Sequence, residues 1–366
     1  MKIETLQVQN FKNYYEEKFW FGDRFNCIVG SNGMGKTNVL DAIHYLAFTK
    51  SGFQNRDLGN IYHGRDFFVI NGKFKEKKHF EVSCYFDPQK KKIFKLDRKE
   101  IEKVSSHIGN IPLITTSPYD SSIIQQGSEV RRKLVDGTIS QHNSQFLKSL
   151  LSYQHILRQR NALIKSKNHL KASDVSLLDI YDNDAIKLSM EVSKERNRFI
   201  NDIAPLFKKN HDILSDKKDK MTLHHVTNVL ENNFSEMFKS SRKKDLLTQR
   251  TNNGCHKDEF DFRLGDYQLK KIGSQGQQKT FILAFRLSQY DLLRTKTKTK
   301  PIILLDDIFD KLDENRIELL INLLSDQERF GQVVLSDANF KRVSLHFSHR
   351  TDSNIFEINN GRLVRT

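Results

Sequence analysis

Residues 25–40 read FNCIVGSNGMGKTNVL. Residues 25–29 predict a strand, and Leu40, Ile43 and Ala47 recur at the spacing of a helix. Between them lies the glycine-rich segment GSNGMGKT, residues 30–37. A strand, a glycine loop and a helix in this order form the context in which such a pattern binds phosphate. The sequence therefore predicts an α/β nucleotide-binding core.

The loop supplies most of the expected contacts to ATP. The predicted nucleotide-binding residues are Gly30, Ser31, Asn32, Gly33, Met34, Gly35, Lys36, Thr37 and Asn38. The glycines let the backbone wrap around the phosphates. Lys36 is expected to reach the β- and γ-phosphates as a catalytic cation, and the Thr37 hydroxyl is expected to bind Mg²⁺. ATP and Mg²⁺ are therefore the predicted cofactors.

A second chemical element follows an apolar run near the C-terminal end. Residues 301–316 read PIILLDDIFDKLDENR, in which four branched apolar residues predict a strand buried on both faces. Two carboxylates at the end of such a buried strand require a nearby cation, such as a metal ion. Asp306 is expected to bind the metal, and Asp307 is the predicted catalytic base that orients or deprotonates water. An acidic pair could also cap a turn or a helix, but its pairing with a phosphate loop favours catalysis.

A second small-residue loop, GSQGQQKT at residues 273–280, runs into another apolar helix pattern. Free backbone N–H groups at a helix start suit phosphate binding. The order of phosphate loop, Ser-x-Gly-Gln loop, acidic pair and Leu-Asp resembles the ABC-type ATPases. Ser274, Gly276 and Gln277 match the LSGGQ signature of that class, while Gly273 and Gln275 replace its leucine and first glycine.

The ABC resemblance implies a composite active site. In that class the signature loop contacts the γ-phosphate held by a partner subunit, so an ATP-dependent homodimer with two sandwiched nucleotides is expected. Asp313 would belong to the loop that follows the acidic pair. Transport ATPases carry a glutamine and a histidine at two further loops. The corresponding stretches here read ITTSPYDSS and VVLSDANF, which does not favour a transporter.

The remaining chain predicts two further layers. Alternating apolar residues between 67 and 96 predict an antiparallel sheet, with Phe80, Val82, Cys84 and Phe86 on one face. Residues 112–116 predict a short strand, and strand character returns after Cys255. From about 128 to 238 the pattern is helical and lacks sustained heptads, which predicts a compact lobe of short helices rather than a long coiled-coil arm.

The predicted architecture is an ABC-type ATPase head with an inserted helical lobe. The head combines a mixed-sheet core with an antiparallel β subdomain. We divide the chain into residues 1–127 as the first part of the head, 128–240 as the helical lobe, and 241–366 as the second part of the head.

Composition and charge limit the function classes. The 366 residues carry a net charge of +15, and all but two of the excess positive charges lie in residues 1–250. No apolar run approaches the roughly 18 to 20 residues of a membrane span, and the N-terminal residues lack the apolar segment of a signal peptide, so cytoplasmic localisation without a membrane partner is expected. The three cysteines are expected to be packing residues.

Basic runs could follow a nucleic-acid backbone. The candidate DNA contacts are Arg131, Arg132, Lys133, Arg242, Lys243 and Lys244. The alternative is a solvated surface, and the sequence leaves both open.

Several motifs in order resemble the RecF family of recombination mediators over nearly the whole chain. They are LQVQNFKNY, GSNGMGKTN, TTSPYDSSIIQQGSEVRRKLVD, GCHKDEFDF, SQGQQKT and LLDDIFDKLD. Cys255 and Lys257 stand where the family usually has proline and arginine, and LSDAN replaces a threonine-rich strand end.

The RecF resemblance implies an ATP-dependent DNA-binding protein of gap repair and replication restart. It implies double-stranded or gapped DNA as partner, cooperation with RecR and RecO, slow ATP hydrolysis that DNA stimulates, and help in recombinase loading. Two alternatives stay open. One is a nucleotide-gated DNA clamp with little turnover. The other is an ATPase of the overcoming-lysogenization or defence type, which normally carries an extra nuclease domain that is not expected here.

Overall fold

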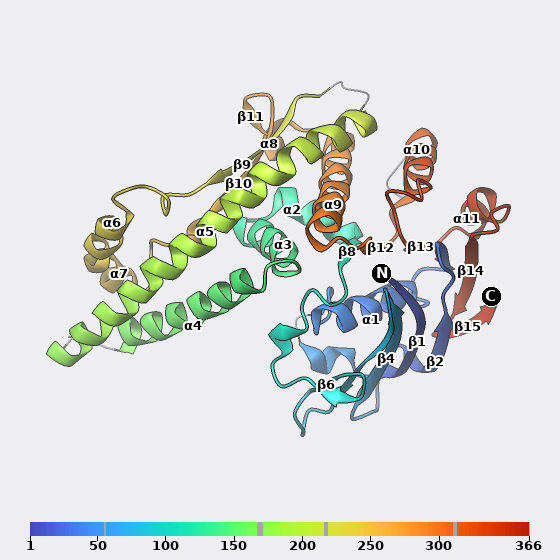
Figure 1. Ribbon diagram of the computed structural model, residues 1–366, viewed down its shortest axis with the longest axis horizontal. Helices are drawn as coiled ribbons and strands as arrows, with labels where there is room; N and C mark the ends of the chain where they lie inside the picture. The colour runs from blue at the N-terminus through green and yellow to red at the C-terminus, as the bar shows by residue number, and fades with distance from the viewer. Residues whose placement is uncertain (55, 167–170, 216–218, 310–312, 366) are drawn as a thin grey trace. The chain divides into compact units, whose positions relative to one another are not determined.

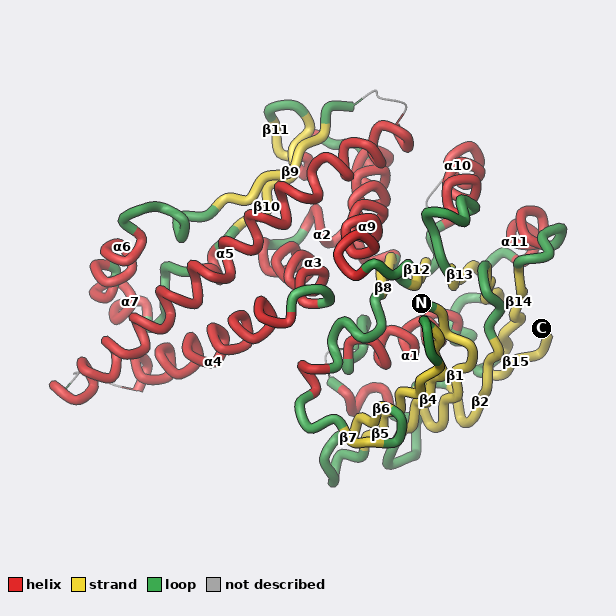
Figure 2. The backbone as a smooth tube through the Cα atoms, in the orientation of Figure 1, coloured by secondary structure: helices red, strands yellow, loops and turns green. Residues whose placement is uncertain are grey.

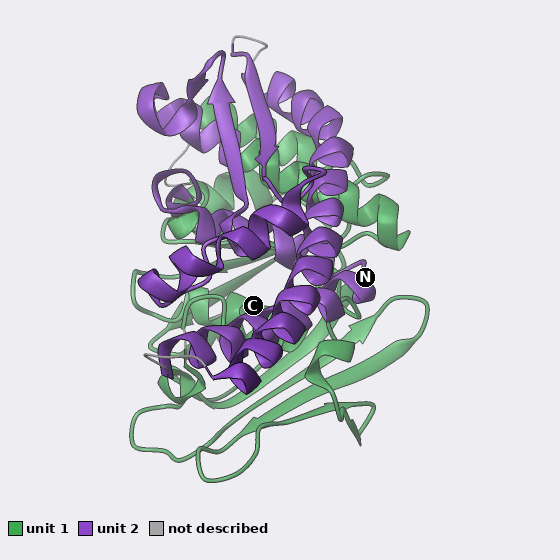
Figure 3. Cartoon of the chain, turned by 90° about the vertical axis from the view of Figure 1, so that its left-hand side faces the viewer, with its two compact units in different colours: residues 1–120, 283–366 green, residues 121–282 purple. Residues whose placement is uncertain are grey.

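The computed structural model describes residues 1–54, 56–166, 171–215, 219–309 and 313–365. The chain divides into two compact units, residues 1–120 with 283–366 and residues 121–282, which Figure 3 shows in different colours. The first unit contains two six-stranded sheets, and the second combines helices with a three-stranded sheet. This composition matches the predicted ATPase head with an inserted helical part.

The core sheet of the first unit has the strand order β15-β14-β3-β13-β12-β8. Its strands are β3 Phe25–Val29, β8 Leu113–Thr116, β12 Ile302–Leu305, β13 Val333–Asp337, β14 Ser353–Asn359 and β15 Arg362–Arg365. β13 pairs in parallel with β3 and β12, and only β15 runs antiparallel to its neighbour. Every residue of β3, β12 and β13 is buried, which explains why these strands are mostly apolar; the polar exceptions are Asn26 in β3 and Ser336 and Asp337 at the end of β13. The carboxyl ends of these three strands therefore meet at one edge, where ligands bind in open α/β sheets.

The second sheet of this unit is antiparallel throughout, with the order β2-β1-β4-β5-β6-β7. Its strands, drawn in yellow in Figure 2, are β1 Lys2–Phe11, β2 Tyr14–Trp20, β4 Phe68–Lys75, β5 His79–Phe86, β6 Ile93–Leu96 and β7 Lys99–Glu100. On β5, Val82 and Cys84 are buried, and Phe80 and Phe86 pack partly buried against the core, as the alternation predicted.

Helices complete the first unit. They are α1 Lys36–Phe48, α10 Glu314–Leu324, α11 Phe340–Phe347, the short helices η1 Asp57–Asn60, η2 Val104–Ser106 and η3 Pro118–Asp120, and the part of α9 Gln275–Thr297 after residue 282. α1 contacts β13 of the core sheet and β4 of the antiparallel sheet. Its buried Val39, Leu40 and Ile43 thus join the two sheets into one core.

The second unit is built around a long pair of neighbouring helices, α4 and α5 (Figure 1). Its helices are α2 Ser121–Gln125, α3 Ser128–Ser140, α4 Ser144–Ser166, α5 Ala172–Ser215, α6 Phe234–Ser240, α7 Arg242–Thr248, α8 Leu269–Ile272, η4 Cys255–Lys257 and the start of α9. Its sheet has the order β11-β10-β9, with β9 Met221–Val226, β10 Glu259–Leu264 and β11 Tyr267–Gln268.

The prediction of short helices is corrected, because α4 has 23 residues and α5 has 44. Two arginines explain the weak apolar pattern. Arg160 on α4 is fully buried against Asp182 on α5, and Arg196 on α5 is buried against Asp136. Polar pairs at core positions interrupt the apolar spacing that identifies a helix interface. Conversely, Leu151 on α4 and Met190 on α5 are apolar side chains that are 43% and 46% exposed.

The predicted boundaries at 127 and 240 also differ from the structure. β9, which lies in the segment predicted to be helical, pairs with β10 so that Leu223 opposes Phe262. Phe281 of α9 packs against Phe207 at 4.9 Å and Phe262 at 4.7 Å between ring centroids. Residues 241–282 therefore fold with the helical unit rather than with the head, and that unit begins at Ser121.

Two expectations from composition concern packing and membranes. Cys27, Cys84 and Cys255 are all buried and free, which agrees with a packing role. No helix in the described part of the chain is both long enough and apolar enough to cross a membrane.

Candidate nucleotide-binding site

The phosphate-binding loop joins β3 to α1, and side chains at the turn between β1 and β2 bind its backbone. Gly35 is the N-cap of α1 with φ of 114°, a left-handed conformation that favours glycine. The Tyr14 hydroxyl donates a hydrogen bond to the Gly35 carbonyl at 3.0 Å, and Asn13 Nδ2 donates to the Met34 carbonyl at 2.9 Å. A Cβ on Gly35 would lie 2.6 Å from Asn13 Nδ2. The turn between β1 and β2 therefore fixes the backbone of the loop.

The predicted loop side chains meet the predicted acidic strand at the carboxyl edge of the core sheet. The Thr37 hydroxyl lies 2.9 Å and 3.0 Å from the two carboxylate oxygens of Asp306. Lys36 is 4% exposed, and its Nζ donates to the Ser31 carbonyl at 3.2 Å. These contacts bring a cation, a hydroxyl and a carboxylate to the N-terminus of α1, where backbone N–H groups favour anions.

Ser336, at the carboxyl end of β13, connects the two predicted acidic residues. Its hydroxyl donates to Asp306 Oδ1 at 2.6 Å and accepts the backbone N–H of Asp307 at 3.0 Å. Sequence reasoning missed this residue. The sequence shows only that Ser336 follows three apolar residues of a strand, and its role depends on the sheet order, which places β13 between β3 and β12.

Burial governs the charge of Asp306, which is 2% exposed. Burial raises the pKa of Asp306 above its ordinary value, while the hydrogen bonds from Ser336 and Thr37 and the charge of Lys36 partly oppose that rise. The carboxylate is thus held in a place where its ionised form is costly unless a cation is nearby.

Asp307 stands at the turn that ends β12. Its φ is 45°, an uncommon value outside glycine that aspartate tolerates better than most residues. Backbone strain of this kind gathers at functional sites. The left-handed turn sets Asp307 apart from the buried Asp306, and Asp307 itself is partly exposed.

The donor set fits a magnesium ion held together with phosphates. Thr37 and Asp306 present only oxygen atoms, which Mg²⁺ prefers, and protein sites for this ion often use one or two carboxylates and leave other positions to phosphate and water. Within the described residues, no group of three or more His, Cys, Asp or Glu side chains could hold a metal alone.

The signature-like loop lies in the second unit, at the start of α9. Ser274 Oγ accepts the N–H of Gln277 at 3.2 Å, and Gln277 Oε1 accepts the N–H of Ser274 at 2.9 Å. These reciprocal bonds form a capping box. Gly273 replaces the usual leucine for a steric reason, since a Cβ there would lie 2.7 Å from the Leu269 carbonyl oxygen. Ser274 remains exposed at the helix N-terminus.

Asp313 has a local structural role. It is the N-cap of α10, and its side chain accepts the Arg316 N–H at 3.0 Å. Leu312, its partner in the predicted Leu-Asp pair, lies outside the described residues.

The arginines among the DNA candidates hold the second unit together. Arg131 is 6% exposed, forms an ion pair with Glu259 at 2.8 Å and donates to two backbone carbonyls. Arg132 donates to the Asp258 carbonyl at 2.7 Å, and Arg242 bonds to Asp182 on α5. Burial and its ion pair engage Arg131 within the unit, while Arg132 and Arg242 are partly exposed and stay predicted DNA contacts.

Three lysines stay exposed. Lys133 pairs with Glu129 one helical turn away at 2.7 Å, a surface contact of small energy. Lys243 and Lys244 are exposed on α7.

Comparison with known proteins identifies the family. The family model RecF/RecN/SMC N terminal domain matches residues 2–344. A DNA replication and repair protein RecF of Cytophaga hutchinsonii is 40% identical over all of this chain and 97% of its own length. The chain belongs to the RecF family. A RecF of Flavobacterium johnsoniae is 38% identical over 93% of this chain and 95% of its own.

Solved structures agree with the RecF assignment. A recombination mediator protein, described as RecF-ATPrS in the RecFOR pathway, has a TM-score of 0.87 and 25% identity, covering 99% of this chain and 97% of that one. An Smc head bound to the C-terminal winged-helix domain of ScpA has a TM-score of 0.57 at 16% identity over 99% of this chain and 96% of that one, which shows the fold alone. The predicted RecF family and ABC-type ATPase head are thus confirmed.

Replacing the buried carboxylate should stabilise the nucleotide-free protein. In Asp306→Asn we expect the free energy of unfolding at neutral pH to rise by about 0.5–2 kcal/mol, the usual range of a single stabilising substitution. Folding raises the pKa of the Asp306 carboxyl, so the wild-type protein loses stability as pH rises from the unfolded-state pKa through the folded-state pKa. Above the folded-state pKa this loss stays constant. Urea unfolding across this acid range and at pH 7 measures the difference between the two proteins.

The matched control is Asp313→Asn, which keeps an N-cap side chain and should change stability little. A lower stability of Asp306→Asn at neutral pH would show that its hydrogen bonds with Thr37 and Ser336 outweigh the burial of charge.

Proposed function

We propose that this protein is an ATP-dependent DNA-binding switch of recombinational gap repair and replication restart. The observation that carries the nucleotide part is the contact of the Thr37 hydroxyl with the Asp306 carboxylate beside the phosphate loop. Membership of the RecF family supports the repair role, since the relatives are named DNA replication and repair proteins. A defence-type ATPase is the weaker candidate for the same reason.

Each candidate site residue in the first unit has a role in this proposal. The loop backbone and the N-terminus of α1 hold the phosphates, and Lys36 exchanges the Ser31 carbonyl for the β- and γ-phosphates. Thr37 and Asp306 would hold Mg²⁺, which neutralises charge that develops on the transferred phosphoryl group. Asp307 orients the attacking water and accepts its proton, while Ser336 keeps both acidic residues in place.

The second unit supplies the other half of a composite site. Ser274 and the first N–H groups of α9 serve the γ-phosphate bound by a second copy of the chain, so ATP drives homodimerisation. The capping box holds Ser274 in one orientation for this contact. Because one copy lacks this half for its own nucleotide, hydrolysis by the monomer is weak and works as a switch.

The partners proposed for the dimer are double-stranded or gapped DNA, RecR, and functionally RecO, in the cytoplasm, with recombinase loading as the outcome. The solved RecF relative is described as a recombination mediator of the RecFOR pathway, which supports this choice. A nucleotide-gated clamp with little turnover is the alternative form of the same function. Comparing ATP turnover with and without DNA separates the two, because only the switch is stimulated.

Binding to duplex, single-stranded and gapped DNA with and without ATP tests the DNA part. We expect ATP to increase affinity and affinity to fall steeply with salt, since each neutralised phosphate releases counterions. In Lys243→Ala/Lys244→Ala, the slope of log affinity against log salt should become shallower by about 0.9 for each DNA phosphate that the variant no longer neutralises.

Lys36→Ala is the control for this measurement. It keeps the surface lysines, so it should lose the effect of ATP while its salt dependence stays as in the wild type without ATP. Salt-insensitive binding, or an unchanged slope in the double variant, would make the α7 lysines an ordinary solvated surface.

A further inference from the structure

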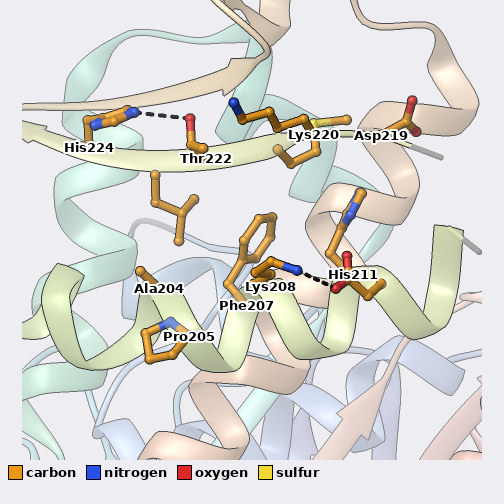
Figure 4. Close-up of a pocket in the computed structure, with 12 residues that line it drawn as sticks. Ala204, Pro205, Phe207, Lys208, His211, Asp219, Lys220, Thr222 and His224 are labelled. Atoms are coloured by element: carbon orange, nitrogen blue, oxygen red, sulfur yellow. Dashed lines mark hydrogen bonds and ion pairs between the residues drawn. The ribbon is translucent and has the colours of Figure 1, made fainter. Parts of the chain in front are cut away.

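An acidic residue just before β9 contacts the signature-like loop although it lies 58 positions away in the chain. Asp219 stands at one end of a groove of about 670 Å³ between α5 and β9, which Figure 4 shows with Asp219 beyond Lys220. Asp219 Oδ1 accepts a hydrogen bond from Gln277 Nε2 at 2.8 Å. Both residues belong to the second unit.

With this contact, both ends of the Gln277 side-chain amide form hydrogen bonds. Its oxygen already accepts the N–H of Ser274 at 2.9 Å, and its nitrogen faces Asp219. An ionised carboxylate only accepts hydrogen bonds, whereas an amide has one accepting and one donating end. If the amide were rotated by half a turn, its oxygen would face the Asp219 carboxylate and its nitrogen would face the Ser274 N–H. Asp219 therefore selects the orientation in which the capping box can form.

Neighbouring contacts hold the rest of the loop but leave this choice open. Gln278 Nε2 donates to the Gly273 carbonyl at 2.9 Å, and Gln278 Oε1 accepts from Gln125 at 2.8 Å. These bonds fix the chain on either side of Ser274. They do not act on the Gln277 amide, whose orientation is set by the Ser274 N–H at its oxygen and by Asp219 at its nitrogen.

We propose that Asp219 is a positioning residue of the signature loop. Through Gln277 it holds Ser274 in the conformation that meets the γ-phosphate of a second copy. The inference rests on the proposed composite site and adds to it a residue outside the loop. A bond from an amide to a charged group is stronger than one between neutral groups, so its loss should be measurable.

Asp219→Ala should bind ATP as the wild type does, because the phosphate loop belongs to the other unit. Its ATP-dependent dimerisation and its maximal turnover should each fall by about tenfold, the scale of one hydrogen bond to a charged group. Asp219→Asn keeps an accepting oxygen and should restore most of both. Nucleotide titration, sedimentation with ATP, and kcat measured separately from KM give the readouts.

A double-mutant cycle isolates the contact. In a Gln277→Ala background, Asp219→Ala should have no further effect, because the group it positions is gone. The control is Asp212→Ala, which removes another carboxylate of the same groove, paired with Lys208 at 2.7 Å, and should leave dimerisation unchanged.

Two outcomes would overturn the inference. The first is wild-type dimerisation and kcat in Asp219→Ala. The second is an equal effect of Asp219→Ala with and without Gln277. The composite site has a separate test, because Ser274→Arg should prevent dimerisation whatever Asp219 does. If Ser274→Arg abolishes dimerisation and Asp219→Ala does not weaken it, the role of Asp219 fails alone.

Discussion

The Asp307→Asn variant is expected to bind ATP and accumulate as a dimer while its turnover falls by about 10²-fold or more, the scale of losing a general base. Asparagine has nearly the same shape as aspartate and tolerates the left-handed backbone at this position, where φ is 45°. The hydrogen bond between the Asp307 N–H and Ser336 also stays, because it uses the main chain. Only the carboxylate that we propose as the acceptor of a proton from water is removed.

Single-turnover hydrolysis and sedimentation in ATP measure the two effects of Asp307→Asn separately. Asp313→Asn is the control, since it removes a nearby carboxylate but keeps the cap of α10. Unchanged turnover in Asp307→Asn would assign the base to another residue. Loss of ATP binding would instead give Asp307 a structural role in the phosphate site.

The second large effect is expected from Ser274→Arg. The substitution places a long cation at the exposed start of α9 and removes the hydroxyl that accepts the Gln277 N–H. ATP affinity should stay near that of the wild type, because the phosphate loop lies in the first unit, whereas ATP-dependent dimerisation should be lost. Nucleotide titration and size measurement with and without ATP check both parts.

Ser274→Thr is the matched control, because threonine keeps a hydroxyl that can cap the helix. It should retain dimerisation. A loss of ATP binding by monomeric Ser274→Arg would show that the loop serves the nucleotide of its own chain.

The sequence predicts the ATPase head well because its elements depend on local patterns. β12 is buried on both faces and is a continuous apolar run, β3 is buried and apolar except for Asn26, and β5 alternates because it is covered on one face. The helical unit is harder to predict. Arg160 and Arg196 occupy buried positions through ion pairs with residues on other elements, and no local pattern indicates such pairs.

Some residues of the candidate site can also be predicted from local sequence patterns, and others cannot. Lys36, Thr37 and Asp306 follow from motifs, and the structure brings them together. Ser336 and Asp219 act through contacts between distant segments, so their roles appear only in the folded chain. Runs of basic residues suggest more contacts than the fold leaves exposed. They do not distinguish an exposed lysine on α7 from Arg131, which is buried in an ion pair.

We propose that two copies of this chain share each active site, and mixing two inactive variants tests this arrangement. Lys36→Ala lacks the cation for the phosphates, and Ser274→Arg lacks the signature contact. A mixed dimer has one site with both lesions and one site with neither. We expect ATPase activity to return in the mixture to at most half of the wild-type activity per dimer. Continued inactivity, despite direct demonstration of mixed dimers, would contradict the composite site.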